Sequence, residues 1–565
     1  MKVVIIGGVA GGASAAARLR RLDEQAEIVV FERSGYISYA NCGLPYYIGG
    51  AIEDPEALTL QTPESFFARF RVDMRVRHEV TAIHPEKKTV CVKNLETGKE
   101  FEEPYDKLLL SPGAKPTQPP VPGVGLEKLF TLRTVEDTYR VKEYNRRNRP
   151  RSAVLAGGGF IGLELAENLR ELGMDVTIVQ RPKQLMNPLD ADMAAFIHSE
   201  MRRHGVKLAL GHTVEGFAEK DDGVDVLLKD EAPLHADMVV LAIGVTPDTA
   251  LAKEAGLELG LKGSIVVNDR METSVPDIYA VGVAVQVKHY VTGQDVLLSL
   301  AGPANKQGRI AADNICGGDS RYLGSQGSSV IKVFDMTAAS TGVNETNARK
   351  AGLCVDTVVL SPMSHAGYYP GGKLMTMKVV FEKETFRLLG AQIVGYEGVD
   401  KRIDVLATAI HAGLTAIQLK DLDLAYAPPY SSAKDPVNMA GFMVENLSRG
   451  VVKQFHLEDI PALPRDGSVT LLDVRTPGEY FRGHIEGFRN IPVDELRERL
   501  SEIESGKPVY VICQSGLRSY IACRVLAGYG YDPYNFSGGF RFYDAVVNDR
   551  RLTEQATACG MDGNA

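Results

Sequence analysis

The sequence predicts an α/β protein made of several parallel-sheet units, and three observations carry this prediction. A short apolar strand, a Gly-rich turn, a helix-forming stretch and a second strand follow one another over residues 3–32. The same order recurs over residues 152–179, and a third strand–turn–helix unit begins near residue 468. Between the second and third units, alternating strands and an amphipathic helix near residues 402–412 indicate an α+β region.

Length and composition describe a globular chain. Its 565 residues correspond to about four domains of roughly 150 residues each. The net charge of −9 argues against a general affinity for nucleic acid or anionic membranes. No apolar run approaches the ~20 residues of a membrane helix. Because glycines interrupt the apolar N-terminus, that segment does not resemble a signal peptide. We therefore expect a cytoplasmic protein with no nucleic-acid or membrane partner.

The seven cysteines form no CxxC pair and no cluster with the spacing of metal ligands. Neither a metal site nor a secreted disulfide framework is therefore expected. In a reducing compartment, such unpaired cysteines are candidates for chemistry. They stand at positions 42, 91, 316, 354, 513, 523 and 559.

The first Gly-rich turn lies between a strand and a helix. Such a turn allows a close approach of the backbone to a pyrophosphate, which faces the helix N-terminus. Glu32 ends the second strand, where a carboxylate accepts a hydrogen bond from a ribose 2′-hydroxyl. Val9 stands where the strict fingerprint has glycine. The predicted dinucleotide contacts of this turn are Gly7, Gly8, Ala10, Gly11 and Gly12.

The second Gly-rich turn is a full GxGxxG motif with Gly157, Gly159 and Gly162. Its second strand ends in Gln180 and Arg181, not in an acid. A carboxylate there would repel a 2′-phosphate, whereas this pair tolerates one, so NADPH is expected beside NADH. The alternative is that Arg181 only points to solvent.

Cys42 lies in the segment SYANCGLPYY, shortly after the first acidic residue. Two Gly-rich turns followed by such a cysteine resemble the pyridine nucleotide–disulfide oxidoreductases, over about residues 1–445. The resemblance implies FAD at the first turn and a nicotinamide nucleotide at the second. It adds the cofactor contacts Arg33, Gly113, Gly244, Gly282, Val283, Pro303 and Ala304. At Val283 the family has an aspartate that bonds the flavin, and an unpaired flavin hydroxyl costs about 1–3 kcal/mol.

A narrower resemblance is to the coenzyme A-disulfide reductases, carried by SYANCGLPYY, LAGPAN at 300–305 and YAPPYS at 426–431. Because Tyr47 replaces a second cysteine, Cys42 would cycle through a mixed disulfide, a persulfide or a sulfenic acid. The resemblance implies that Tyr368 and Tyr426 of a partner subunit donate protons near Cys42. It implies coenzyme A contacts from Ser14, Arg18, Arg21, Ser38, Asn41, Arg71, Asn305 and Lys434.

The C-terminal segment resembles the rhodanese fold over about residues 466–545. LDVR at 472–475, GHIEG at 483–487 and CQSGLRS at 513–519 carry the resemblance. Loop N–H groups and a helix N-terminus lower the pKa of such a thiol and hold an anion. Cys513 and Arg518 define a C-x4-R loop, and its size suits a persulfide sulfur at Cys513.

Together these features predict two Rossmann-like domains, an α+β dimerisation domain and a C-terminal α/β rhodanese domain. The expected divisions are 1–115 with 241–322 for FAD, 116–240 for NAD(P), 323–445 for dimerisation, 446–467 as a linker and 468–560 for rhodanese. The last dozen or so residues are expected to be weakly structured. The five cysteines other than Cys42 and Cys513 are expected to pack only.

The predicted function is NAD(P)H-dependent reduction of sulfane sulfur by a homodimer, with coenzyme A persulfide, polysulfide, elemental sulfur and coenzyme A disulfide as substrates. Hydrosulfide would be the product. Two alternatives stay open. One is an NADH oxidase or peroxidase that uses a Cys42 sulfenate. The other is a non-redox sulfur carrier or sensor. Val283, which stands where the family has its flavin-bonding aspartate, keeps this alternative open.

Overall fold

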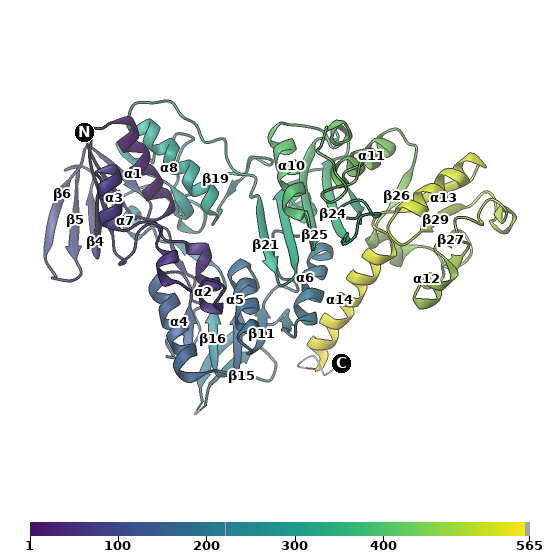
Figure 1. The fold of residues 1–565 in the computed structure, drawn as a ribbon, viewed down its shortest axis with the longest axis horizontal. Coiled ribbons are helices and arrows are strands. Elements are labelled where there is room, and N and C mark those ends of the chain that lie inside the picture. Colours follow the sequence, from purple (N-terminus) through teal and green to yellow (C-terminus); the bar gives the residue numbers. More distant parts are fainter. Residues whose placement is uncertain (221, 560–565) are drawn as a thin grey trace. The chain divides into compact units, whose positions relative to one another are not determined.

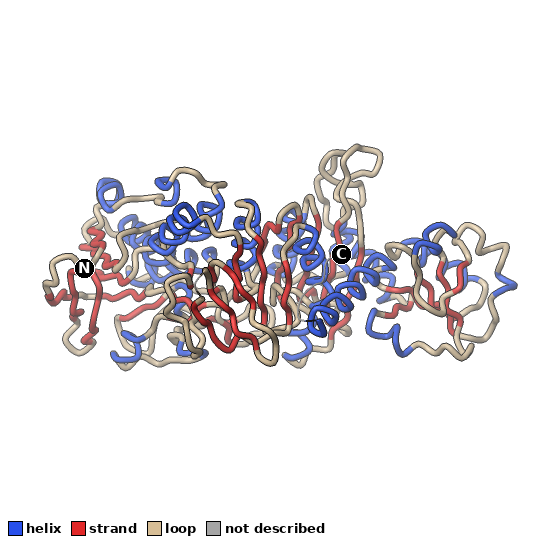
Figure 2. The backbone as a smooth tube through the Cα atoms, turned by 90° about the horizontal axis from the view of Figure 1, so that it is seen from below, coloured by secondary structure: helices blue, strands red, loops and turns tan. Residues whose placement is uncertain are grey.

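The computed structural model describes residues 1–220 and 222–559, with side chains up to residue 555. It divides into two compact units. The first contains Met1–Pro182 and Gly205–Gly327, and the second contains Lys183–His204 and the chain from Ser328 onward. In both units helices border the strands (Figure 2).

The first unit holds a five-stranded parallel sheet with strand order β18-β7-β1-β2-β3. The central position of β1 makes this the predicted doubly wound arrangement. Helices α1 (Ala10–Leu22) and α8 (Ala301–Ile315) lie side by side (Figure 1). The strands are β1 (Lys2–Ile6), β2 (Glu27–Glu32), β3 (Asp73–Val76), β7 (Lys107–Leu110) and β18 (Ile278–Ala280).

A second parallel sheet of the same unit has the order β12-β11-β10-β16-β9. Helix α5 (Phe160–Glu171) follows its central strand, and α4 (Val135–Asn148) precedes that strand. The strands are β9 (Leu129–Thr131), β10 (Ser152–Ala156), β11 (Asp175–Gln180), β12 (Lys207–Leu210) and β16 (Met238–Leu241). The chain thus contains the two predicted parallel-sheet units.

The two Gly-rich turns have the same construction. Gly7 and Gly157 have φ of +98° and +119°, a region that residues with a Cβ atom rarely adopt. A Cβ atom on Gly12 would lie 1.9 Å from the Gly7 carbonyl oxygen, and one on Gly162 would lie 2.0 Å from that of Gly157. In each turn glycine is therefore required both for the bend and for close packing of the following helix.

The second unit contains the predicted α+β region and the C-terminal α/β domain. An antiparallel sheet of order β21-β22-β25-β24-β23 packs against helix α10 (Val399–His411). A parallel sheet of order β26-β30-β29-β27-β28 follows. The antiparallel strands are β21 (Ser329–Val333), β22 (Met336–Gly342), β23 (Val355–Leu360), β24 (Met375–Glu382) and β25 (Leu388–Gly395). The parallel ones are β26 (Lys453–Phe455), β27 (Thr470–Asp473), β28 (Arg489–Asn490), β29 (Pro508–Ile512) and β30 (Asp532–Phe536).

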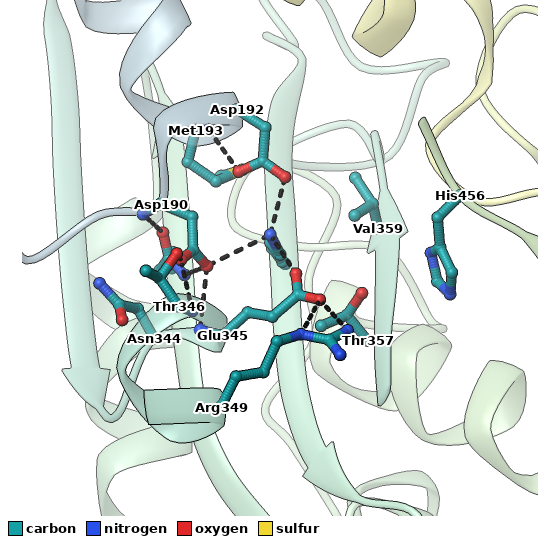
Figure 3. A network of polar contacts seen from close by, with 12 residues as sticks. Asp190, Asp192, Met193, Asn344, Glu345, Thr346, Arg349, Thr357, Val359 and His456 are labelled. Atoms are coloured by element: carbon teal, nitrogen blue, oxygen red, sulfur yellow. Dashed lines mark hydrogen bonds and ion pairs between the residues drawn. The ribbon is translucent and has the colours of Figure 1, made fainter. Parts of the chain in front are cut away.

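A buried lysine attaches helix α6 (Ala191–Arg203) to the antiparallel sheet. Lys378 Nζ lies 2.7 Å from Asp192, 2.8 Å from Glu345 and 3.2 Å from Asp190. Asp190 also accepts from the backbone N–H groups of Glu345 and Thr346, which start helix α9 (Glu345–Lys350) (Figure 3). Residues 183–204 are thus held in the second unit by charge pairing in a buried setting.

One prediction about the C-terminal part is wrong. The segment 446–467 is not a plain linker, because residues 453–455 form β26 and pair with β30. This strand has only three residues and only Phe455 is buried, so its structure depends on tertiary pairing. The prediction that the last dozen or so residues are weakly structured falls partly outside the described residues, and within them helix α14 runs over Gly539–Cys559. Its buried face includes Asp549 and Thr553, whose polar side chains hide the helical pattern.

Candidate active site

Cys42 lies in a short 3₁₀ turn (Asn41–Gly43) just before helix α2 (Leu44–Gly49), and it is exposed. The amide of Asn41 bonds the carbonyl oxygen of Arg133 at 3.0 Å and the Arg133 guanidinium at 2.6 Å. This contact attaches the turn to the segment that precedes α4. The predicted reactive thiol therefore lies at the surface on an anchored turn.

The surroundings of Cys42 disfavour its thiolate. Desolvation raises the pKa of the Cys42 thiol, the charge of Glu164 raises it further, and Arg133 opposes both. Glu164 lies on α5, and desolvation together with repulsion from Glu167 raises its own pKa to about 7. Desolvation and the same two carboxylates raise the pKa of Tyr46 to about 12. A titrating carboxylate that the sequence did not single out therefore controls the charge around Cys42.

The two Gly-rich turns fit the pyrophosphate of a dinucleotide. The residues before α1 and α5, Val9 and Gly159, provide no side-chain cap, so the first N–H groups of both helices remain for a phosphate. Glu32 accepts from the Gly8 N–H at 2.9 Å, and Gln180 accepts from the Gly158 N–H at 3.0 Å. The side chains that end the two second strands therefore face the turns.

The predicted flavin contacts near residue 283 lie between β18 and α8. Gly282 donates its N–H to the buried Gln307 side chain at 2.7 Å. Val283 is half-buried in a 3₁₀ turn (Gly282–Ala284) and supplies no acceptor. Arg33 forms an ion pair with Asp248 at 2.8 Å. The turn keeps its backbone geometry, but its side chain is apolar where the family has a carboxylate.

A cavity of about 380 Å³ lies over helices α1 and α8. Arg18 pairs with Asp313 at 2.7 Å, and Ser14 donates to Asn305 at 2.6 Å. Five of the eight residues predicted to contact coenzyme A line this cavity: Ser14, Arg18, Arg21, Ser38 and Asn305. The remaining lining residues are Ala13, Ala17, Phe66 and Arg309. The structure thus gathers a polar and cationic cavity from segments almost 300 residues apart.

The other three predicted coenzyme A contacts do not line that cavity. Asn41 contacts Arg133 beside Cys42, as described above. Arg71 ends helix α3 (Pro63–Phe70), and its guanidinium lies 5.2 Å from the centre of the Phe67 ring. Lys434 belongs to the second unit.

Tyr368 and Tyr426 come together in the second unit. Their hydroxyl oxygens are 2.5 Å apart, and the side chains are 76% and 46% exposed. The hydrogen bond between the two hydroxyl groups is the main cause that raises the pKa of Tyr426. Two exposed, mutually bonded phenols are suited to hold and pass a proton.

Cys513 follows β29 and precedes helix α13 (Leu517–Gly528), as the rhodanese resemblance implies. Its side chain is fully buried. Its sulfur accepts from the Gly516 N–H at 3.1 Å and from the Ser519 hydroxyl at 3.2 Å. These contacts place one N–H donor and one O–H donor at Sγ, next to the N-terminus of α13. Arg518 is paired with Glu479 at 2.7 Å.

The remaining cysteines follow the packing prediction only in part. Cys523 is buried in α13 and packs as predicted, and burial raises the pKa of its thiol. Cys354 is exposed, and Cys91 and Cys316 are half-buried, so the prediction is wrong for Cys354. The side chain of Cys559 lies outside the described part of the chain.

The sequence patterns do not identify several residues of the candidate sites. Arg309 stands four residues after Asn305 on α8, a helical spacing that places both on one face. Glu479 stands three residues after Thr476, the pattern of a capping box. Glu164 follows the second Gly-rich turn directly, but nothing in its neighbours predicts its approach to Cys42.

In the part that the structure describes, no helix is both long and apolar enough to cross a membrane. Residues 1–308 match the family model of the pyridine nucleotide-disulphide oxidoreductases. Residues 328–436 match that of their dimerisation domain, and residues 457–545 match that of the rhodanese-like domain.

Individual relatives match either the first 78% of the chain's length or nearly all of it. A coenzyme A disulfide reductase of Staphylococcus aureus (strain JH9) is 37% identical over 445 residues, which cover 78% of this chain and 99% of that protein. The crystal structure of reduced Bacillus anthracis CoADR-RHD is 49% identical, covers 97% and 98% of the two chains, and has a TM-score of 0.95. An NAD-dependent persulfide reductase from A. fulgidus is 39% identical, covers 96% and 100%, and has a TM-score of 0.90.

These matches confirm the predicted fold class and the predicted cofactors, since the family uses FAD and NAD(P)H. The chain belongs to the pyridine nucleotide-disulphide oxidoreductases, as a flavoprotein enzyme with a dimerisation domain and a C-terminal rhodanese-like domain.

Proposed function

We propose that this enzyme reduces sulfane sulfur carried by coenzyme A at the expense of NAD(P)H. Coenzyme A persulfide is the immediate substrate, polysulfide and elemental sulfur are its sources, and coenzyme A disulfide is a second substrate. Hydrosulfide is the product. The observation that carries the proposal is the arginine-containing cavity that adjoins the Cys42 segment.

The cavity has the charge that a phosphate-bearing ligand needs. Three guanidinium groups line it, those of Arg18, Arg21 and Arg309, and Asp313 pairs with the first of them. Guanidinium groups match phosphate oxygens in both charge and geometry. Ser38 also lines the cavity and stands four residues before Cys42, so the two Cα atoms are at most about 14 Å apart. A ligand whose phosphates bind here needs only a modest arm to bring its sulfur to Cys42.

The thiol of Cys42 reacts with the sulfur at the end of this arm. Its thiolate attacks the inner sulfur of the persulfide CoA–S–SH, which forms Cys42–S–S–CoA and releases HS⁻. The two electrons that reduce this mixed disulfide to two thiolates would come from NAD(P)H through FAD held at the first Gly-rich turn. Gln180 and Arg181 at the end of β11 support the use of both NADH and NADPH.

Tyr368 and Tyr426 hold the proton that the reaction moves. The match to a dimerisation domain supports a homodimer in which the partner subunit supplies this bonded phenol pair to Cys42. A phenol that hydrogen-bonds a second phenol donates a proton to a leaving thiolate and recovers it from its neighbour.

Cys513 loads the carrier. Its thiolate takes the outer sulfur of a donor R–S–SH, which forms Cys513–S–SH and releases RS⁻. The thiolate of coenzyme A then takes this sulfur, which forms CoA–S–SH and regenerates Cys513. The Gly516 N–H and the Ser519 hydroxyl hold the anionic sulfur during these steps. The names of the relatives from S. aureus and A. fulgidus, a coenzyme A disulfide reductase and a persulfide reductase, agree with the two halves of this scheme.

The test measures NADH-dependent hydrosulfide release from coenzyme A persulfide without oxygen, by the full-length enzyme and its Cys42→Ser variant. We expect loss of release in the variant, and unchanged release would refute the proposal. The mass of Cys42 after turnover separates the alternatives. A coenzyme A adduct supports the proposal, whereas added oxygen supports a sulfenate oxidase. Protein without a flavin spectrum would support the non-redox carrier.

A further inference from the structure

Arg518 beside Cys513 forms a bidentate ion pair with the carboxylate of Glu479. Its Nη1 atom lies 2.8 Å from Glu479 Oε2, and its Nη2 atom lies 2.7 Å from Glu479 Oε1. Glu479 stands on helix α12 (Pro477–Arg482), and both side chains are partly buried. Two parallel charge-assisted hydrogen bonds are among the strong polar contacts in proteins. The guanidinium that the loop would offer to an anion is therefore already bound.

The carboxylate of Glu479 is also held from its other side. Its Oε2 atom accepts from the Thr476 N–H at 2.9 Å and from the Thr476 hydroxyl at 2.8 Å. These contacts form the capping box of α12, so Glu479 cannot turn away without exposing the helix start. The Arg518 hydrogen bonds outweigh burial and lower the pKa of Glu479 to about 2. The group is therefore fixed and ionised at neutral pH.

A second guanidinium next to the loop is neutralised in the same way. Arg475 pairs with Asp473 at 2.7 Å, and both side chains are at most 1% exposed. The Nη1 atom of Arg475 contacts the loop residue Gln514 at 3.3 Å. Within the described part of the chain, the direct donors to the Cys513 sulfur are the neutral Gly516 N–H and Ser519 hydroxyl. The loop therefore suits a sulfur atom but has little net positive charge for a larger anion.

We propose that Glu479 is a specificity-determining residue, which makes the Cys513 site select donors of bare sulfane sulfur, such as persulfides and polysulfide, and discriminate against donors that carry a sulfonate. This inference rests on the proposed function of Cys513 as a sulfur acceptor. With a persulfide, Cys513–S⁻ and R–S–SH give Cys513–S–SH and RS⁻, and no multiply charged group enters the loop. With thiosulfate, Cys513–S⁻ and S–SO₃²⁻ give Cys513–S–S⁻ and SO₃²⁻. The sulfonate then needs the guanidinium that Glu479 occupies.

The experiment measures persulfide formation on Cys513 by intact-protein mass spectrometry. Full-length protein carrying Cys42→Ser is used, and Cys513→Ser in the same background reports sulfur bound elsewhere. The donors are thiosulfate and pantetheine persulfide, whose thiol is uncharged. The readout is the ratio of the second-order rate constants for thiosulfate and for pantetheine persulfide. Glu479→Gln keeps the size of the side chain and one acceptor oxygen, but it removes the charge that neutralises Arg518.

We expect Glu479→Gln to raise this ratio at least about tenfold, the effect of releasing one charge-assisted contact. Thr476→Val removes a capping hydrogen bond and leaves the ion pair, so it should not raise the ratio. The double variant Glu479→Gln/Arg518→Met should lose the gain, because the gain requires the freed guanidinium. A ratio that stays below tenfold in Glu479→Gln, or rises equally in Thr476→Val, overturns this inference alone. Failure of every donor to load Cys513 overturns the proposed function as well.

Discussion

Asp549, on the last helix of the chain, is bonded to His198 on helix α6. Its Oδ2 atom lies 2.8 Å from His198 Nδ1, and its Oδ1 atom lies 2.6 Å from Arg202. His198 and Asp549 are both buried. Burial opposes the charge of Asp549, yet the contacts with His198 and Arg202 outweigh it and lower its pKa. Helices α6 and α14 lie side by side (Figure 1), so α14 is fixed to residues 191–203.

Replacing Asp549 with Asn should loosen this attachment. The amide keeps one hydrogen bond but loses the charge that compensates Arg202, so we expect a loss of about 1–3 kcal/mol. Denaturant unfolding of the full chain, together with hydrogen exchange over residues 539–555, measures the change. The matched control is Asp544→Asn on the exposed face of the same helix, which should change neither quantity. Equal exchange in both variants would contradict the prediction.

The same ion pair predicts acid sensitivity of the attachment. Because the pKa of Asp549 is lowered in the folded protein, its pair contributes stability above the ordinary aspartate value of 3.8. That contribution is lost as the pH falls through the lower value of the folded protein. Because intrinsic amide exchange itself changes with pH, the test compares protection factors. Those over α14 should fall in acid more in the wild-type protein than in Asp549→Asn. A parallel acid response of the two proteins would count against it.

Lys378 should be among the most sensitive positions of the second unit. Burial opposes its charge, but Asp192, Asp190 and Glu345 more than compensate and raise its pKa. Lys378→Met would leave these buried carboxylates without their cation, and we expect a loss of about 3–5 kcal/mol in denaturant unfolding. Lys350→Met, at an exposed position on α9, is the control and should change stability little. Similar losses in both variants would show that the network is not the cause.

Glu164→Gln should make Cys42 more reactive. The charge of Glu164 is one cause of the raised pKa of the Cys42 thiol, so its removal favours the thiolate. The pKa of Glu164 is about 7, and its charge is therefore present above that pH and absent well below it. We expect several-fold faster alkylation of Cys42 by iodoacetamide above pH 7, with the difference fading in acid. The control is Glu171→Gln at the exposed end of the same helix, and a difference independent of pH would refute the argument.

Strands and turns with strong local patterns could be predicted from the sequence. The segments that form β1, β2, β10 and β11 are apolar and end in glycine or a polar residue. Their local sequence is therefore enough to predict a strand, with little contribution from tertiary contacts. The wrong prediction of a plain linker concerns an element that depends on a distant partner, because strand β26 has one buried residue and forms by pairing with β30. Helix α14 likewise buries Asp549 because this side chain pairs with His198 and Arg202. A polar residue carries no apolar signal, so such a helix face is hidden in the sequence.

The candidate sites show the same division. Motif residues such as Cys42, Cys513 and the glycines lie where the patterns predict them. Glu164, Arg309 and Glu479 act through tertiary contacts with residues far along the chain or on another element. The charge of Glu164 acts on Cys42, and the charge of Glu479 acts on Arg518. The spacing of residues along the chain does not predict these tertiary contacts.

Removing the C-terminal domain should destabilise what remains, which affects how its role is tested. Deleting residues 446–565 cuts helix α11 (Pro436–Ser448) before its end and exposes the α6 face that packs on α14, including the ring of Phe196, which stacks on Phe542. It also removes His456, which pairs with Asp356 of β23 at 2.9 Å, and Gln454, which bonds the Thr357 carbonyl at 3.0 Å. We expect the truncated chain to begin unfolding at least about 5 °C below the full-length protein.

Full-length Cys513→Ser is the matched control, because it removes the sulfur chemistry and keeps these contacts. Its thermal transition should lie close to that of the wild-type protein, and its use of coenzyme A persulfide should persist, since that step requires Cys42. Its use of polysulfide should fall if Cys513 loads the carrier. Equal thermal transitions of the truncated and full-length chains would show that the contacts with α6 and β23 contribute little to stability. The truncated chain is expected to lose activity toward both substrates, whereas Cys513→Ser should lose only polysulfide reduction. In that case the additional loss comes from the missing contacts and not from the missing thiol.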